Sequence, residues 1–220
     1  MNKAILLCGL TLALAPLAEA GIYYNGTGGV IPDGLSSLTQ TITSTDVGII
    51  GSVSVVFNIS GGLNGDLIAY LAYNDGSSTM TQILLNHITG GSRGFGTGAA
   101  TTGFASLQAN GVTLMDGGVN GNIHSANPGS GNPVAVGNYT PDSTVTFSST
   151  FANMNASGTW TLFFADTVTG DQSTLVSWGL DITPVPEPVN VALGIFGGCL
   201  AITVLLRANF AKWSFIFHAR

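Results

Sequence analysis

Residues 158–182 of the 220-residue chain read GTWTLFFADTVTGDQSTLVSWGLDI. Two runs in this stretch alternate apolar and polar side chains, so that every second residue is apolar. The apolar positions are Trp160, Leu162 and Phe164 in the first run, and Val176, Trp178, Leu180 and Ile182 in the second, where Asp181 points out. Such alternation is typical of antiparallel strands with one face on a core and the other in water. Gly170-Asp171 predicts the turn between them.

The same pattern extends along the chain. In residues 53–59, Val53, Val55, Phe57 and Ile59 share one face. Further predicted strands are Ser37–Thr43, Asp66–Tyr73, Met80–Leu85 and Thr144–Ser149, and turn residues separate them at Gly61-Gly62, Asn74-Asp75-Gly76 and Gly90-Gly91. About eight short strands without an amphipathic helix predict an all-β fold, a jelly-roll-like β-sandwich. Residues 91–103 and 117–133 have few apolar anchors and are predicted to be long surface loops.

The first twenty residues have the layout of a secretory signal peptide. Lys3 precedes an apolar run from Ala4 to Ala15, and Ala18-Glu19-Ala20 is a small-x-small cleavage pattern. We expect signal peptidase to cut between Ala20 and Gly21. An N-terminal membrane anchor is the alternative, although the apolar run is short for a spanning helix.

The C-terminal region predicts a membrane helix. Residues 189–206 carry no charge, and at 1.5 Å per residue they cover about 27 Å, close to the thickness of a bilayer core. Arg207, Lys212 and Arg220 follow. Positive flanks stay cytoplasmic, so the bulk of the chain is predicted to face outward.

Residues 185–220 resemble the PEP-CTERM sorting signal of Gram-negative bacteria. The resemblance rests on Val185-Pro186-Glu187-Pro188, followed by the apolar segment and then the basic residues. It implies that an exosortase, a membrane protease-transpeptidase, recognises and cuts the tail. In this chain the last charges are spread among aromatic residues instead of forming a short basic cluster.

Between these segments lie residues 21–184, a stretch long enough for one domain with its own core. It carries nine Asp, one basic residue (Arg93), and neither Lys nor Glu. Because phosphate binding needs a basic surface, nucleic acid is excluded as a partner. The two cysteines, Cys8 and Cys199, belong to the apolar segments, so the exported domain is predicted to have no disulfide.

The order of motifs in this middle region resembles the P domain, the β-sandwich that follows the catalytic domain of kexin- and furin-like subtilases. The matching stretches are Ile31-Pro32-Asp33, 51–55, 65–71, Met115-Asp116, 137–141 and 158–182. The family often has a histidine before the Asp-Leu pair, whereas residues 60–64 here are SGGLN. The subtilase catalytic domain is absent, so the resemblance implies a fold and not a peptidase activity.

A hydrolase needs a nucleophile, a base and an orienting acid in one pocket. Outside the tail only His87 and His124 are available as bases, and neither lies beside a nucleophile motif. The sequence therefore predicts no catalytic residues and no enzyme. A structure that brought either histidine to a Ser and an Asp would reverse this prediction.

Calcium is the one metal that the sequence suggests, although no cofactor is required. Asp166 and Asp171 bracket Thr167-Val168-Thr169-Gly170, a loop that could wrap a hard cation. Asp66 and Asp75 lie near other turns. The alternative is that these aspartates cap turns by accepting bonds from their own backbone.

Together the segments predict an exported, non-catalytic envelope or extracellular-matrix protein, held in the inner membrane before processing and then at the cell surface or outside. Exopolysaccharide or envelope proteins are the partners that the sorting resemblance implies. A glycan- or protein-binding module is the main alternative, with Tyr23, Tyr24, Tyr70, Tyr73 and Phe95 as candidate exposed aromatics. A peptidase-associated accessory domain is the third.

Overall fold

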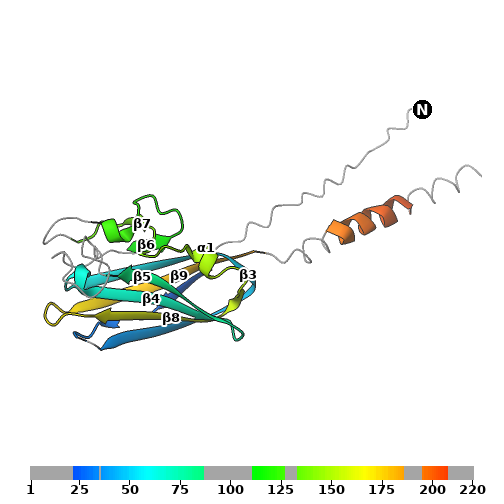
Figure 1. Ribbon diagram of the computed structural model, residues 1–220. Coiled ribbons are helices and arrows are strands. Elements are labelled where there is room, and N and C mark those ends of the chain that lie inside the picture. The colour runs from blue at the N-terminus through cyan, green and yellow to red at the C-terminus, as the bar shows by residue number, and fades with distance from the viewer. Residues whose placement is uncertain (1–21, 35, 87–110, 127–132, 186–194, 208–220) are drawn as a thin grey trace, which may run out of the picture.

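The computed structural model describes residues 22–34, 36–86, 111–126, 133–185 and 195–207, and in them nine strands pair into one mostly antiparallel sheet (Figure 1). The strands are β1 (Ile22–Gly26), β2 (Gly29–Val30), β3 (Ser37–Gly61), β4 (Leu67–Asn74), β5 (Thr79–Asn86), β6 (Val112–Met115), β7 (Gly137–Tyr139), β8 (Asn155–Asp166) and β9 (Ser173–Val185). Between them lie the short helical turns η1 (Asn64–Asp66), η2 (Ile123–Ser125) and α1 (Phe147–Thr150). The predicted all-β class is confirmed.

The long strand β3 folds the sheet back on itself. Its residues 37–45 pair with β8, and the order β3-β8-β4-β5 forms the first sheet. The register shifts between Thr45 and Ile49, and residues 49–61 then pair with β9 in the second sheet, which also contains β1, β2, β6 and β7. Gly48 lies in the bend with φ 113, a conformation that side chains disfavour. The predicted strands 37–43 and 53–59 are thus two halves of one strand.

The two sheets enclose an apolar core. Phe57 of the second sheet meets Phe164 of the first edge to face, with ring centroids 5.7 Å apart. Trp160 and Trp178 are both buried, as the alternation predicts, and Asp181 is exposed. The Trp178 indole covers Gly26 so closely that a Cβ there would lie 1.9 Å from its Nε1 atom. This contact explains why β1 has a glycine at that point.

One inward position was predicted wrongly. Val176 is 47% exposed, whereas its neighbour Leu175 is buried. Asn58 of β3 pairs with Ser177 of β9, and the next residue, Ile59, pairs with Leu175. Val176 therefore has no partner on β3 and is an extra residue in β9. A β-bulge of this kind switches the side-chain alternation, which the sequence pattern did not show.

The predicted strand 144–149 is also wrong, because residues 147–150 form the single helical turn α1. Its first amides, those of Phe147 and Ser148, donate to the two carboxylate oxygens of Asp116 at 2.7 and 2.8 Å. Thr146 caps the turn by accepting from the amide of Ser149 at 3.2 Å. Side-chain acceptors at the start of a helix favour the helical turn over an extended strand.

The predicted loop 117–133 is anchored within its described part. Ile123 in η2 is fully buried, and the Asn122 side chain donates to the carbonyl of Pro141 at 2.8 Å. Residues 127–132 and the whole predicted loop 91–103 lie outside the described residues.

The chain enters and leaves the sandwich at the same end. Ile22 pairs with Ile182 and Ile49 pairs with Val185, so β1 begins where β9 finishes. We call this the tail end. Val185, the first residue of the predicted sorting motif, is the last residue of β9, while Pro186 to Pro188 lie outside the described residues, as do Ala20 and Gly21.

Residues 195–207 are helical. They cover the second part of the predicted membrane segment 189–206, and residues 189–194 lie outside the described residues. Among the described residues, no helix has both the length and the apolar character that a membrane crossing requires.

Candidate functional site

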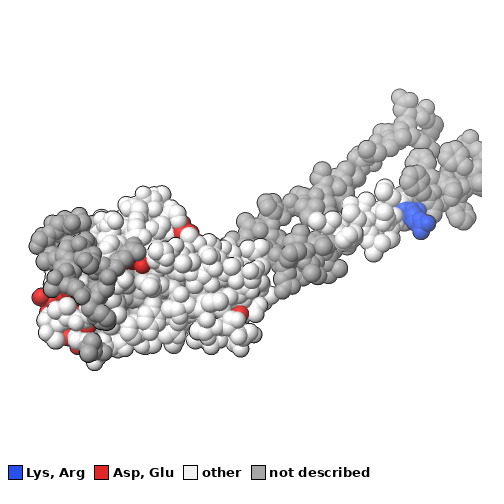
Figure 2. Space-filling view, viewed as in Figure 1, with Lys and Arg blue, Asp and Glu red and all other residues white. Residues whose placement is uncertain are grey.

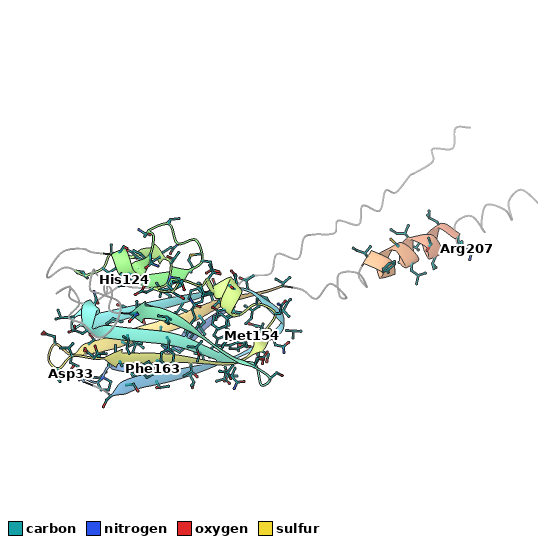
Figure 3. The ribbon with its side chains drawn as sticks, viewed as in Figure 1. Asp33, His124, Met154, Phe163 and Arg207 are labelled. Carbon is teal, nitrogen blue, oxygen red and sulfur yellow. The ribbon has the colours of Figure 1, made fainter. Side chains whose placement is uncertain are left out.

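Three loops meet at the end of the sandwich opposite the tail end, which we call the distal end. They are the β2–β3 loop with Asp33, the β3–β4 loop that runs from Gly62 through η1 to Asp66, and the β8–β9 loop from Thr167 to Gln172. Strand pairing brings them together, because Gly61 pairs with Ser173 and Leu67 pairs with Asp166. Acidic side chains gather at the left end of the space-filling view, where Figure 3 places Asp33 (Figures 2 and 3).

Backbone and carboxylate bonds link the three loops. Asp33 Oδ2 accepts from the amide of Gly170 at 3.1 Å, across 137 positions of sequence. The carbonyl of Asp66 accepts from the Thr167 amide at 2.9 Å and from its hydroxyl at 3.0 Å. The loop from 166 to 171 needs unusual backbone angles at its end, with φ 101 at Gly170 and φ 50 at Asp171.

Asp166 lies at the centre of this end. Its side chain is fully buried, and while Oδ1 accepts from the amide of Val168 at 3.2 Å, Oδ2 has no hydrogen-bond partner. Burial, followed by the negative charges of Asp66, Asp33 and Asp171, raises the pKa of Asp166 to about 6, against the opposing bond from Val168. The ionised form of this carboxyl is therefore destabilised by its surroundings.

The structure thus brings both predicted metal residues, Asp166 and Asp171, to the distal end, and adds Asp33 and Asp66. Sequence reasoning missed Asp33 because only the folding of β9 back along β2 brings it to the 166–171 loop. Asp75, in contrast, serves its own turn: its Oδ1 accepts from the amides of Ser77 and Ser78 at 2.9 and 2.8 Å, and these bonds lower its pKa. Among the described residues, no three His, Cys, Asp or Glu side chains are arranged to hold a metal.

His124 is held by a buried acid that the sequence analysis did not connect with it. Its Nδ1 atom lies 2.7 Å from Oδ2 of Asp142, whose side chain is buried, while the histidine is partly exposed. The same η2 turn is capped by Asn122, which accepts from the His124 amide at 2.9 Å. A histidine oriented by a carboxylate is two parts of a three-part hydrolase arrangement, and the nucleophile is the third. His87 lies outside the described residues.

The outer face of the first sheet, formed by outward side chains of β3, β8, β4 and β5, is free of charge. The cross-strand register places them in three rows: Thr39, Phe163, Tyr70 and Ile83; Thr41, Thr161, Ala72 and Thr81; and Thr43, Thr159, Asn74 and Thr79. In the first row Tyr70 and Phe163 stack with centroids 4.3 Å apart and an angle of 11°. Figure 3 labels Phe163 on β8.

An open groove of about 630 Å³ lies across the third row. Asn74, Asp75, Gly76, Gly158 and Thr159 are among the residues that line it. Of the aromatics predicted to be exposed, Tyr70 is partly exposed, but Tyr73 is fully buried and points into the core. The side chains of Tyr23 and Tyr24, and all of Phe95, lie outside the described residues.

The sequence matches no protein-family profile, and no curated protein matches it. Two crystal structures match part of the chain: a serine protease of Aeromonas sobria, and that protease in complex with its chaperone ORF2. Both alignments have 14% sequence identity and cover 76% of this chain, with TM-scores of 0.42 for the protease and 0.44 for the complex. They cover only 27% and 28% of the matched chains, so the present chain spans less than a third of either.

Proposed function

We propose that this chain is an exported, non-catalytic envelope protein, sorted through its PEP-CTERM tail, whose P-domain-like, jelly-roll-like sandwich acts as a structural or interaction module. The observation that carries the proposal is the position of the two chain ends. Both the region after the predicted signal peptide and the region before the predicted sorting segment join the sandwich at the tail end.

Because both chain ends join the sandwich at the tail end, the distal end is the part of the domain farthest from the predicted membrane segment. The thirteen residues of β9 run from the distal end to the tail end, about 40 Å at the usual rise of a strand. A chain held in the inner membrane by residues 189–206 therefore presents its distal loops away from the anchor, while its uncharged outer face runs along the side of the domain. After cleavage near Pro186-Glu187-Pro188 the same surfaces act at the cell surface or beyond it.

The sorting step is tested in the native host by fractionation and intact mass. The variant replaces Pro186, Glu187 and Pro188 with alanine, and the matched control is Pro184→Ala, a proline just before the motif. We expect the wild type and the control to lose the tail and leave the inner membrane, while the triple variant stays there at full length. If all three stay at full length in the inner membrane, the tail is a plain anchor and the sorting proposal fails.

The non-catalytic part is tested with a fluorophosphonate probe, which labels activated serines. We expect no labelling of the full-length chain. Labelling that disappears in His124→Ala and persists in the control Asn120→Ala would show that the His124–Asp142 pair activates a nucleophile, and the proposal would be replaced by a hydrolase.

A second candidate function, glycan binding, is favoured by the stacked pair Tyr70–Phe163 on the outer face of the first sheet. The same face carries a groove lined by hydroxyl and amide groups and by Asp75. Aromatic faces next to polar groups suit sugar rings. Affinity electrophoresis in gels containing the host's exopolysaccharide tests it. We expect Phe163→Ala to migrate faster than the wild type and the control Thr45→Ala to be retarded like the wild type. Equal mobility of all three proteins with and without polysaccharide would exclude the outer face as a glycan site.

A further inference from the structure

The buried carboxylate of Asp166 has no positive partner within the described sandwich. The described parts of residues 22–185 contain no Lys or Arg, and the charges that act on Asp166 come from Asp66, Asp33 and Asp171. The Asp166 side chain is fully buried, and its Oδ2 atom has no hydrogen-bond partner. A buried ion beside like charges is strongly destabilising unless a ligand or partner neutralises it.

Other buried oxygens at the distal end also lack partners. Oδ1 of Asp33 and Oγ of Ser173 are shielded from solvent, and neither has a hydrogen-bond partner. Ser173 is fully buried, and the amide of Ile31, two residues before Asp33, donates to its carbonyl at 2.9 Å. Gly62 faces both the Ser173 hydroxyl and the Asp171 carbonyl. A Cβ atom added to Gly62 would lie 1.8 Å from Ser173 Oγ and 2.5 Å from the Asp171 carbonyl oxygen, so these two oxygens are close to each other. Buried polar atoms are normally satisfied, so several unsatisfied oxygens at one end point to a ligand.

We propose that the distal end binds one calcium ion, which Asp166 Oδ2 holds together with Asp33 and with the neutral oxygens of Ser173 and the Asp171 backbone. Every atom in this set is a hard oxygen, which suits calcium, and the described residues of the three loops include no histidine or cysteine to favour zinc. Because no three carboxylates of the described residues are arranged around one point, the affinity for calcium is expected in the range of about 10⁻⁴ to 10⁻³ M, as in extracellular calcium modules.

Calcium bound there would tie together three loops that are far apart in sequence. Asp33 precedes β3, Asp166 ends β8, and Ser173 begins β9. The ion would bind the folded chain and not the unfolded one, so it would stabilise the fold by mass action. This inference does not depend on the sorting proposal, because it concerns only the described sandwich.

The test is thermal unfolding of the full-length chain in detergent near neutral pH, first in EDTA and then with calcium at up to about 10 mM. We expect calcium to raise the Tm of the wild type by about 3–5 °C, the shift expected at roughly ten times the dissociation constant. Asp166→Asn should show no rise, and Ser173→Ala a smaller one. The matched control is Asp181→Asn, which changes an exposed aspartate on β9 and should respond like the wild type.

Each outcome decides the question. No rise in the wild type, or an equal rise in Asp166→Asn, overturns the site, and an equal rise with magnesium overturns the assignment to calcium. The Tm in EDTA shows whether the Asp166→Asn variant is folded. Because this substitution removes a buried charge, the Tm of the variant in EDTA should equal or exceed that of the wild type. A misfolded variant would be recognised there before calcium is added.

Discussion

The two ends of the sandwich bury different kinds of side chain, although each contains a buried carboxylate oxygen without a hydrogen-bond partner, Asp46 Oδ2 at the tail end and Asp166 Oδ2 at the distal end. At the tail end, Tyr73 stacks on Trp160 with centroids 3.9 Å apart, and Phe151 packs edge-on against both. The polar atoms of this cluster are satisfied: Trp160 Nε1 donates to Ser44 Oγ at 3.1 Å, and Ser44 donates to the carbonyl of Ala156 at 2.6 Å. At the distal end, Asp166 is buried among other acids with one oxygen unpaired.

The tail end therefore stabilises the fold through packing, whereas the distal end contains an acidic group whose ionised form is destabilised. Aromatic burial with complete hydrogen bonding stabilises a fold without a ligand. A buried carboxylate with incomplete bonding destabilises it until a proton or a cation binds. The end joined to the predicted sorting tail therefore contains the stabilising aromatic cluster, and the distal end contains the destabilised carboxyl of Asp166.

The largest effect is expected at the tail end. Trp160→Ala should reduce the free energy of unfolding by about 3–5 kcal/mol, because it empties the centre of the aromatic cluster and leaves Ser44 without its indole donor. Urea denaturation measures the change. Thr161→Ala, the next residue on the same strand but on the outer face, should stay within about 0.5 kcal/mol. Similar losses for both variants would contradict the aromatic closure.

A smaller effect is expected from Ser44→Ala, which removes only the hydroxyl between Trp160 and Ala156. The loss should be about 1–3 kcal/mol, since a buried indole N–H and a buried carbonyl lose their partner. Thr43→Ala, exposed on the opposite face of β3, is the control in the same urea experiment. A loss no greater than that of the control would mean that water replaces the hydroxyl.

An effect of opposite sign is expected at the distal end, where substitution of Asp166 should stabilise the fold at neutral pH. The pKa of Asp166 is raised from 3.8 to about 6 in the folded chain, so its stabilising contribution is present below pH 3.8 and is lost as the pH rises through 6. In EDTA, the Tm of the wild type should therefore fall, relative to that of Asp166→Asn, between about pH 4 and pH 7. Parallel Tm curves for the two proteins would show that Asp166 is not the titrating group.

Much of the core was predictable because the alternation of apolar and polar residues in the sequence matches the alternation of buried and exposed side chains along each strand. Trp160, Leu162, Phe164, Trp178 and Leu180 are all buried as predicted, since a strand must place alternate residues on opposite faces. The prediction failed where one residue interrupts that period, as at Val176, or where a distant acid captures backbone amides, as Asp116 does for α1. Neither the β-bulge at Val176 nor the capping of α1 by Asp116 can be recognised from the neighbouring residues in the sequence.

The candidate site was predictable only in part. Asp166 and Asp171 bracket one loop, so their proximity follows from the chain itself. Asp33 reaches the same loop through the pairing of β2 with β9, and Asp142 reaches His124 through the bridge between Asn122 and Thr140. These contacts join residues whose spacing carries no motif.

The all-β class, the alternating core and the scarcity of positive charge could be read from the amino-acid sequence, which also predicts the export and sorting segments. Those features depend on composition and on local periodicity, which the chain carries whether or not it is folded. Three features became visible only in the folded chain: β3 belongs to both sheets, the chain enters and leaves the sandwich at one end, and Asp166 is buried near other acids. Burial and like-charge proximity are properties of packed strands, so they exist only after distant segments have paired.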